Sequence, residues 1–382
     1  MLLRQKRRNF AAILLSNETG MRQLLIILTC LLTTLTSRGQ HVIRVEKNDA
    51  ASLLEAINTA NQQNASPQSP RLYVIIPDGL YDLGDRVLTR ISGHNIAFIG
   101  ESMKGTIIRN EPDKKSEGIS KTAVLQNRGT GNVFQDLTLQ NALDYYGCKT
   151  DGRAVTLHDK GTRTICNRVR LLSYQDTYYS DNEHCQHYFA DSEIHGTVDF
   201  ICGAGDVWFE GCRIVTEKRS LAPNDNNRNV IAAPRTNGTP WGYIFHNCTI
   251  ENDKSSFDYA RGWKDTPHCI WLNTTLLTPE KLRNTRFDTR GMRTVMSDFK
   301  EYGTRDANGV DITPASNIIT YTLTVKENKD GKEIVTEQRR TAETILTAEE
   351  AARYTVEHVF ADWNPRKTVR TVEKQSQKLL KK

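Results

Sequence analysis

The sequence predicts an all-β fold, a single-stranded right-handed parallel β-helix with short capping helices. A loose pattern, apolar–x–polar–small–x–apolar, occurs six times between residues 133 and 276. Val, Ile, Phe and Thr take alternating positions, and Gly or Asn separates the copies. Self-similarity at such a period is typical of a solenoid of short strands. The copies are 134–139, 166–171, 189–194, 209–214, 245–250 and 271–276, with starts 32, 23, 20, 36 and 26 residues apart.

The ends of such a solenoid must be closed, because exposed strand edges invite aggregation. Residues 51–60 have the composition of a capping helix, and a polar loop over 61–70 leads to a strand at 72–76. Near the other end, Thr347 and Glu350 form a capping box that predicts a helix to about Phe360.

A β-hairpin is expected before that last helix. Residues 318–325 and 333–337 are rich in strand-forming side chains and flank Asp330-Gly331. An Asp-Gly pair between two such runs is a strong hairpin signal. We interpret the hairpin as a surface insertion without a role in chemistry.

Two aspartates occupy the same phase of the repeat. Asp176 lies ten residues after Cys166, and Asp199 lies ten residues after Phe189. Equal phase in adjacent turns predicts carboxylates stacked roughly 5 Å apart. Two such carboxylates cannot both ionise freely, so we expect one raised pKa and one that stays low. Asp also occurs at solenoid corners for turn chemistry alone, so phase by itself does not establish catalysis.

Three segments carry a resemblance to a known family. Residues 174–179 read YQDTYY, 196–203 read GTVDFICG and 260–263 read ARGW. They resemble the YQDTLY, GTVDFIFG and LGRPW elements of the pectin methylesterases (pectinesterases), and we expect a bacterial-type member. The resemblance continues to LTAEEAA at 346–352 and DWNP at 362–365, so it covers nearly the whole chain after the leader.

The resemblance implies a role for each matching residue. Asp199 matches the nucleophile, which attacks a galacturonate methyl ester, and Asp176 matches the acid that protonates departing methanol. Gln175 matches an oxyanion donor. Arg261 matches the arginine that keeps the nucleophile ionised and would lower its pKa.

Further matches concern substrate binding. Trp263 matches an aromatic platform for a sugar ring, and we expect Tyr179 to bind substrate beside it. The implied partner is methylated polygalacturonate (pectin), with no cofactor, metal, nucleic acid or membrane span, and with a monomeric chain.

The sequence departs from the family at three positions. Arg153 stands where the family has a Gln that serves as second oxyanion donor. It either replaces the amide with a charged donor or points elsewhere, since Arg reaches farther and has no carbonyl. A cation there would suit a substrate with free carboxylates. Cys202 replaces a Phe and Gly262 replaces a Pro, which affects the shape of the cleft.

Net charge separates the chain into three parts. The formal charge is +6, of which residues 1–39 carry +5 and residues 364–382 carry +6, leaving the rest at −5. The middle part therefore does not suit bulk polyanion binding. We expect an N-terminal extension and signal peptide over 1–39, a pectinesterase domain over 40–365, and a solvated or disordered basic tail over 366–382.

The N-terminal region predicts export. Met21-Arg22 precedes an apolar run over 24–35, and small residues follow at 37–39. This pattern is typical of a signal peptide and is too short for a membrane span. We therefore expect a secreted or periplasmic protein whose start is Met1 or Met21, and Cys30 does not lie in a lipoprotein context.

The cysteines and histidines predict neither a disulfide framework nor a metal site. Cys166, Cys212 and Cys248 occupy repeat positions that should face the interior, where a thiol acts as a small hydrophobe. His184, Cys185 and His187 lie close in sequence, but a tight metal site needs more ligands at a recognisable spacing.

Three functions remain open at this point. The leading hypothesis is a methylesterase acting on pectin. A polysaccharide hydrolase is the second, because carboxylates about 5 to 5.5 Å apart also suit a retaining glycosidase. A non-catalytic pectin-binding solenoid is the third. Gln175 and Arg261 favour ester chemistry, because an oxyanion needs donors and an oxocarbenium ion does not.

Overall fold

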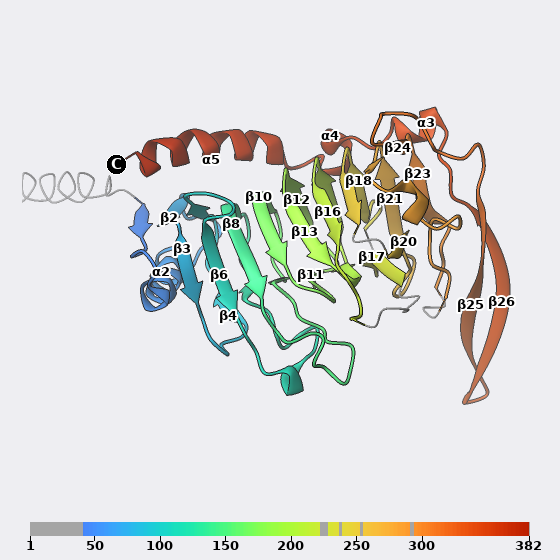
Figure 1. Ribbon diagram of the computed structural model, residues 1–382, viewed down its shortest axis with the longest axis horizontal. Helices are drawn as coiled ribbons and strands as arrows, with labels where there is room; N and C mark the ends of the chain where they lie inside the picture. Colours follow the sequence, from blue (N-terminus) through green and yellow to red (C-terminus); the bar gives the residue numbers. More distant parts are fainter. Residues whose placement is uncertain (1–40, 222–227, 237–238, 253–254, 291–293, 382) are drawn as a thin grey trace, which may run out of the picture. The chain divides into compact units, whose positions relative to one another are not determined.

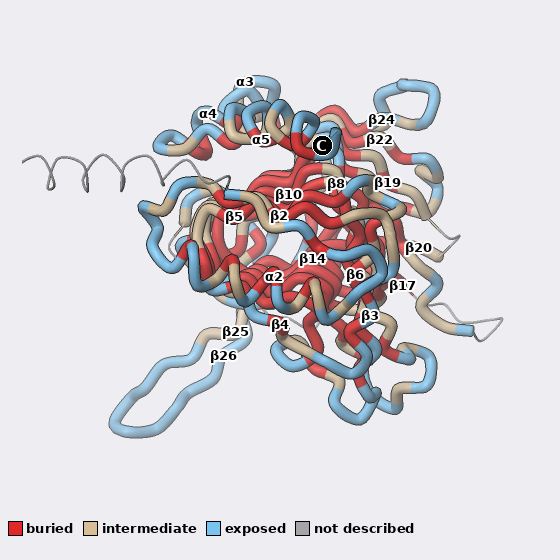
Figure 2. The backbone as a smooth tube through the Cα atoms, turned by 90° about the vertical axis from the view of Figure 1, so that its left-hand side faces the viewer, coloured by how far each residue is buried: buried red, intermediate tan, exposed pale blue. Residues whose placement is uncertain are grey.

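Successive turns of the chain stack into three parallel ladders of short strands (Figures 1 and 2). The computed structural model describes residues 41–381 apart from 222–227, 237–238, 253–254 and 291–293. Residues Val42–Lys382 form one compact unit. The parallel β-helix predicted from the repeat is confirmed, whereas the predicted signal peptide lies outside the described residues.

Two of the ladders form one 17-stranded sheet, because long strands β8 and β10 take part in both. Ladder 1 consists of β1 (Val42–Arg44), β2 (Leu72–Ile76), β5 (Ile96–Gly100), β8 (Val133–Asn141), β10 (Thr164–Leu172), β12 (Gln186–Ala190), β15 (Asp206–Glu210), β18 (Tyr243–His246), β21 (His268–Leu272) and β23 (Asp298–Tyr302). Ladder 2 consists of β3 (Gly79–Asp82), β6 (Thr106–Asn110), the ends of β8 and β10, β13 (Glu193–Gly196), β16 (Arg213–Thr216), β19 (Thr249–Asn252), β22 (Thr275–Leu276) and β24 (Arg305–Asp306).

Ladder 3 is a separate seven-stranded sheet on the opposite side of the solenoid from ladder 1 (Figure 2). It consists of β4 (Thr89–Ile91), β7 (Leu125–Asn127), β9 (Leu157–Asp159), β11 (Tyr178–Ser180), β14 (Val198–Gly203), β17 (Arg228–Pro234) and β20 (Ser256–Ala260). Short 3₁₀ turns, η2 (Lys114–Ser116) and η3 (Pro279–Lys281), lie in connecting loops.

The third residue of each repeat makes the corner between ladders 1 and 2. All six of these residues have positive φ, from 47° to 61°, a region that Gly, Asn and Asp enter most easily. The positive φ angle at the corner therefore explains why a polar residue or Gly stands at the third position of the repeat. The six residues are Asp136, Arg168, Asp191, Gly211, Asn247 and Asn273.

The first residue of each repeat points into the solenoid and stacks on its neighbour in the next turn. Phe189 lies 4.9 Å from Phe209, Phe209 lies 4.5 Å from Phe245, and Phe245 lies 3.8 Å from Trp271, centroid to centroid. All four side chains are buried. Cys166 takes the same position in an earlier turn and is buried, as are Cys212 and Cys248, which confirms their predicted orientation.

Helix α2 (Ala50–Gln63) confirms the predicted N-terminal cap. The Asp49 side chain accepts hydrogen bonds from the backbone N–H groups of Ala51 (2.8 Å) and Ser52 (3.0 Å), which fixes the first turn. Its buried residues recur at helical spacing and face the core. They are Leu53, Ala56, Ile57 and Ala60.

The C-terminal region differs from the prediction in two respects. The capping box of Thr347 and Glu350 is present, but its helix α3 (Ala348–Ala351) ends after one turn and α4 (Val356–Val359) starts anew with Thr355 as N-cap. The tail that was predicted to be solvated or disordered is ordered, because residues Pro365–Leu380 form helix α5, whose Val372 and Leu379 are buried against ladder 1. No helix among the described residues has the length and apolar character needed to cross a bilayer.

The outer face of ladder 1 explains why α5 is ordered. Its strands are apolar on both faces, and outward residues such as Ile99, Val133 and Ile165 would otherwise meet water. Helix α5 lies along this face in Figure 1 and covers it. Arg168 forms an ion pair with Glu373 that joins strand and helix.

The predicted hairpin is present and longer than expected. Strands β25 (Ile318–Lys329) and β26 (Lys332–Glu343) pair antiparallel around Asp330 and Gly331, whose φ values are 52° and 76°. Two positive φ angles at a two-residue turn are what a twisted hairpin requires. Ile319 and Tyr321 join the core, while the distal half is exposed.

The aromatic stack generates the first prediction. Phe209→Ala removes a ring held between two others, so we expect the free energy of unfolding to fall by about 3–5 kcal/mol. Leu277→Ala, at a side chain that is 43% exposed, is the control and should change stability by less than about 0.5 kcal/mol. Urea unfolding followed by circular dichroism measures both, and equal losses would contradict the proposed importance of the stack.

Candidate active site

Asp176 and Asp199 lie side by side where two successive turns enter ladder 3. Tyr178 of β11 pairs with Ile201 of β14, which sets Asp176 opposite Asp199 two residues earlier. The Asp176 N–H donates to the Val198 carbonyl at 3.3 Å. Neighbouring strands are about 4.8 Å apart, so the equal phase read from the repeat does bring the two carboxyl groups together.

Both aspartates occupy a strained part of the backbone map. Their φ values are 59° for Asp176 and 50° for Asp199. The register between β14 and β17 also shifts between Val198 and Ile201, directly at Asp199. Bulges and positive φ angles of this kind re-aim side chains and concentrate at functional sites.

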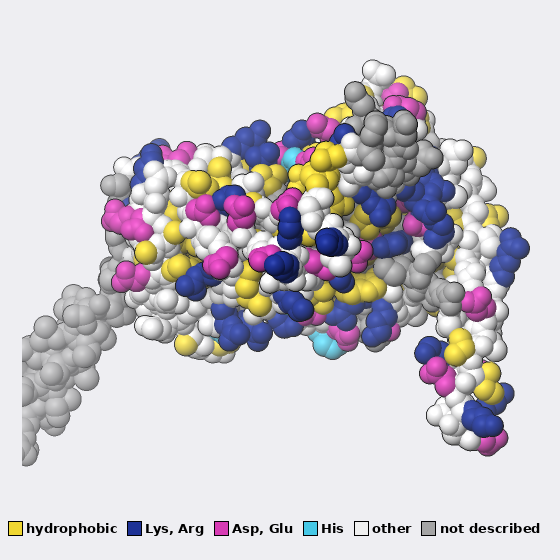
Figure 3. Space-filling model, turned by 60° about the horizontal axis from the view of Figure 1, so that its bottom comes forward, with side chains coloured by type: hydrophobic (Ala, Val, Ile, Leu, Met, Phe, Trp, Pro, Cys, Tyr) yellow, Lys and Arg dark blue, Asp and Glu magenta, His cyan; other side chains and the backbone are white. Residues whose placement is uncertain are grey.

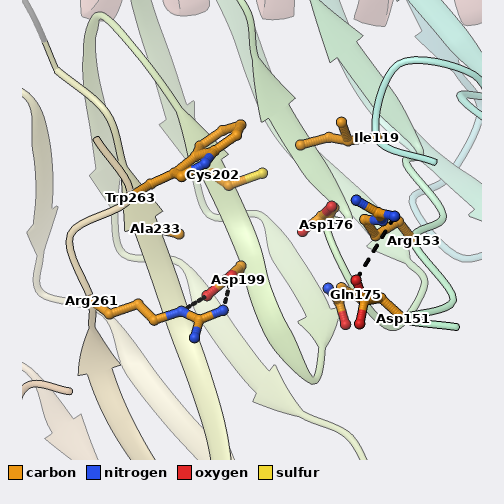
Figure 4. A pocket seen from close by; sticks show the side chains of 10 residues that line it. All are labelled: Ile119, Asp151, Arg153, Gln175, Asp176, Asp199, Cys202, Ala233, Arg261 and Trp263. Carbon is orange, nitrogen blue, oxygen red and sulfur yellow. Dashed lines mark hydrogen bonds and ion pairs between the residues drawn. The ribbon is translucent and has the colours of Figure 1, made fainter. Parts of the chain in front are cut away.

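Arg261 holds Asp199 through two parallel hydrogen bonds. Its Nε donates to Asp199 Oδ1 at 2.8 Å and its Nη2 donates to Oδ2 at 2.5 Å, as Figure 4 shows. Arg261 follows the end of β20, and its N–H donates to the Ala232 carbonyl at 3.0 Å. A bidentate pair fixes the orientation of the carboxylate as well as its charge.

Burial dominates the electrostatics of both carboxyl groups. It raises the pKa of Asp176 well above the ordinary value, and the neighbouring charge of Asp199 raises it further. Burial also raises the pKa of Asp199, although Arg261 acts in the opposite direction. The pKa of Asp199 is therefore raised and not low as expected, because desolvation outweighs the guanidinium, but it is raised less than the pKa of Asp176.

The aspartates form one wall of a cavity of about 180 Å³. Gln175, Asp176, Asp199 and Arg261 all line it, so four predicted catalytic residues meet at one place (Figure 4). Among the described residues, the Gln175 side-chain amide has no hydrogen-bond partner and remains available as a donor. A free N–H beside a carboxylate pair is the group that a developing oxyanion needs.

Arg153 lines the same cavity but is already paired. Its Nε and Nη2 donate to the Glu117 carboxylate at 3.1 and 3.2 Å, and its backbone N–H donates to the same group at 3.0 Å. Its Nη2 also lies 3.8 Å from Asp151. Arg153 is thus neutralised by two acids, and neither acid was identified from the sequence, where no spacing links Glu117 to Arg153.

Trp263 borders the cavity, whereas Tyr179 does not line it. The Tyr179 side chain is 7% exposed. The centroid of its ring lies 6.0 Å from that of Trp263 and 4.8 Å from that of His158. Its hydroxyl donates to Asp181 at 2.8 Å. Arg235 lies 5.5 Å from the Trp263 ring. Tyr179 therefore lies outside the cavity lining and next to Trp263, and its role in substrate binding stays a prediction.

The remaining lining of the cavity is apolar. Ile119, Cys202 and Ala233 complete it together with Trp263. Ile119 and Ala233 were missed, because isolated apolar residues give no sequence signal. Cys202 is a free, buried thiol, and burial raises its pKa.

Of the cysteine and histidine cluster at 184–187, Cys185 and His187 face the interior, whereas His184 is exposed. His187 is buried, with its Nδ1 2.7 Å from the Tyr178 hydroxyl, and Cys185 contacts the Ala204 carbonyl. Within the described part of the chain, no three His, Cys, Asp or Glu side chains gather as a metal site would require. The seven cysteines described are all free.

Comparison with known proteins gives a family match. The family model named Pectinesterase matches residues 42–279, which is more than half of the chain. Pectinesterase 3 of Solanum lycopersicum is 30% identical over 185 residues, which cover 48% of this chain and 31% of the relative. Pectinesterase QRT1 of Arabidopsis thaliana is 28% identical and 70% of each chain is covered. The chain spans between 31% and 40% of the length of the first three curated relatives.

Solved structures share the fold. A pectin methylesterase from Yersinia enterocolitica superposes with a TM-score of 0.59 at 22% identity, covering 80% of this chain and 98% of the other. A pectin methylesterase from carrot gives a TM-score of 0.55 at 20% identity, covering 68% and 79%. The expected bacterial type is not supported, because the curated relatives reported are plant proteins.

The raised pKa of Asp176 predicts a pH-dependent stability. The folded state holds the proton more tightly than the unfolded state, so stability falls as the pH rises from about 3.9 toward the folded pKa. Asp176→Asn removes this loss, and we expect a gain of roughly 1–2 kcal/mol at pH 8 that shrinks toward pH 4. The control is Asp85→Asn at an exposed position. Thermal unfolding across this range measures both, and a pH-independent gain would contradict the assignment.

Proposed function

Since the chain belongs to the pectinesterase family, we propose that it hydrolyses the methyl esters of polygalacturonate and releases methanol. The observation that carries the proposal is the Asp199 carboxylate held by Arg261 directly beside the buried Asp176. The apolar lining of Ile119, Cys202 and Ala233 offers a place for a methyl group. The small cavity suits a compact ester group better than a whole sugar ring.

In the first half of the reaction, Asp199 attacks the ester carbonyl. Arg261 keeps it ionised against the cost of burial and presents an oxygen to the substrate. The attack first forms a tetrahedral oxyanion intermediate, whose collapse breaks the C–O bond to methoxide and leaves an acyl–Asp199 ester. The Gln175 amide stabilises the intermediate oxyanion.

Asp176 supplies the proton for this step and recovers it in the next. Its raised pKa keeps it protonated, so it can donate to the methoxide oxygen as methanol leaves. The resulting carboxylate then takes a proton from water, whose oxygen attacks the acyl carbon. This releases the galacturonate carboxyl group and restores both aspartates.

The rival hydrolase uses the same two carboxyl groups differently. A glycosidase needs a carboxylate free to reach the anomeric carbon. Asp199 would be the nucleophile in both reactions, and Arg261 holds it in the same way in each. The Gln175 amide lines the same cavity and is a donor for an oxyanion, which an oxocarbenium ion does not need. This amide favours an oxyanion intermediate, and methanol release without new reducing ends distinguishes the two reactions.

We further propose that Trp263 contacts the substrate. Trp263 provides a ring face for a sugar unit next to the reacting one, supported from behind by Tyr179 and Arg235. We also propose a monomer, exported by a signal peptide within residues 1–39. N-terminal sequencing of the exported protein and sedimentation test these two points, and an uncleaved N-terminus or a stable dimer would refute them.

Asp199→Asn tests the reaction directly. We expect methanol release from highly methylated pectin to fall by about a thousandfold or more, because the nucleophile is lost while the shape of the side chain stays. Asp206→Asn is the matched control, since Asp206 is a buried carboxylate outside the cavity lining. A folded wild-type chain that releases no methanol would refute the proposed function.

Glu117→Gln tests the role of Arg153. The substitution leaves the Arg153 cation without its main partner, so we expect a several-fold shift in relative rate toward sparsely methylated pectin. Arg153→Gln in the otherwise unchanged chain should shift this preference little, because its charge is already balanced. A larger effect of Arg153→Gln than of Glu117→Gln would show that Arg153 acts on substrate as it stands.

A further inference from the structure

Helix α5 and its C-cap residue carry five basic side chains on one outward face. At about 100° per residue their spacing of 3, 4, 4 and 3 places them within an arc of about 80°, over a length of about 21 Å. All five residues are exposed. This set, called the basic stripe, consists of Lys367, Arg370, Lys374, Lys378 and Lys381.

The packing of α5 forces this arrangement. Val372, Ser376 and Leu379 are buried against ladder 1, so the opposite face must be solvent-exposed. Arg44 donates to the Leu379 carbonyl at 2.8 Å, and Gln135 donates to the Ser376 hydroxyl at 3.1 Å. The helix is fixed at several points along its length, and the cations are held in one row.

The charge of the stripe is not balanced locally. Glu373 is the one acidic residue of α5, and it is turned toward the solenoid, where it pairs with Arg168. Nearby acids are also engaged, since Glu357 pairs with Arg366 and Asp362 pairs with Arg163. None of the five stripe residues forms an ion pair with another described residue.

The stripe is separate from the candidate active site. The stripe lies on the outer face of helix α5, which covers ladder 1. The two aspartates lie on the opposite side of the solenoid, where ladder 3 runs (Figure 2). The face that Figure 3 brings forward carries acidic and basic side chains next to each other. The row of unmixed positive charge on α5 therefore differs in kind from that surface.

We propose that the basic stripe binds an acidic polysaccharide, a polygalacturonate chain with free carboxylates. This inference rests on the proposed function, because such a chain is the product of methyl ester hydrolysis. A row of cations several ångströms apart complements a polymer that carries a carboxylate on each de-esterified unit. Binding there keeps the enzyme on treated polymer and raises the local concentration of methylated segments at the site.

The test is binding of unmethylated polygalacturonate to the full chain by affinity electrophoresis. The stripe variant replaces all five residues with Gln, which favours helix and removes five charges. The control variant replaces Lys326, Lys329, Lys332, Arg339 and Arg340 of the exposed hairpin with Gln, which removes the same charge elsewhere. Both variants should release methanol from a short methylated oligogalacturonate as the wild type does.

We expect the stripe variant to bind on the order of tenfold more weakly at low salt, and the control variant to bind as the wild type. The difference should vanish near 1 M salt, where the screening length is about 3 Å. Equal losses in the two variants, or no loss in the stripe variant, would overturn the inference. If the stripe variant unfolds by circular dichroism, the double variant Lys374→Glu and Lys378→Glu takes its place.

Three further outcomes separate the role of the stripe from binding of another polyanion and from the proposed function. Stripe-dependent binding to phosphatidylserine vesicles or to DNA, with no binding to polygalacturonate, would overturn it in favour of another polyanion. Stripe-dependent polygalacturonate binding by a wild type that releases no methanol would refute the proposed function and leave the stripe intact. Methanol release together with polygalacturonate binding that does not depend on the stripe would overturn the inference about the stripe and support the proposed function.

Discussion

The register between successive turns is the constraint on which the rest of the structure depends. Each of the six repeats has a corner residue of positive φ, and its strands hydrogen-bond to those of the neighbouring turns. This repetition places Phe209 on Phe189 inside the solenoid and Asp199 opposite Asp176 on its wall. A shift of one residue would turn every inward side chain outward, so core packing and carboxylate pairing are set together.

The strand pairing around the two aspartates offsets the unfavourable free energy of burying their carboxyl groups. Asp176 and Asp199 are both buried and both have positive φ, which opposes folding locally. Strand pairing before and after them, together with the two hydrogen bonds from Arg261, holds them in place. The carboxylates are thus oriented by contacts within the protein itself, as electrostatic stabilisation of a transition state requires.

Periodic features could be predicted from the sequence, and contacts between aperiodic segments could not. Three features carry signals in the local sequence: the repeat, the helix that follows Asp49 and the Asp330-Gly331 turn. Each of them forms the element that was predicted, the solenoid turns, helix α2 and the β25–β26 hairpin. The pairing of Arg153 with Glu117 joins a strand entry to a loop with no fixed spacing. The pKa of Asp199 depends on complete burial, which residue type does not reveal. The single long helix expected after Thr347 ended early because Thr355 caps a second one.

The error over the C-terminal tail has a physical origin that also explains its charge. Counting Lys and Arg suggested a solvated end, but ladder 1 is apolar outside as well as inside and needs a cover. Val372 and Leu379 supply that cover at helical spacing, and Asn364 with Pro365 starts the helix. Once these apolar residues face the sheet, helical geometry leaves the basic residues only the outer face. The packing of α5 on ladder 1 therefore both covers the apolar face of the solenoid and holds the basic residues in a row.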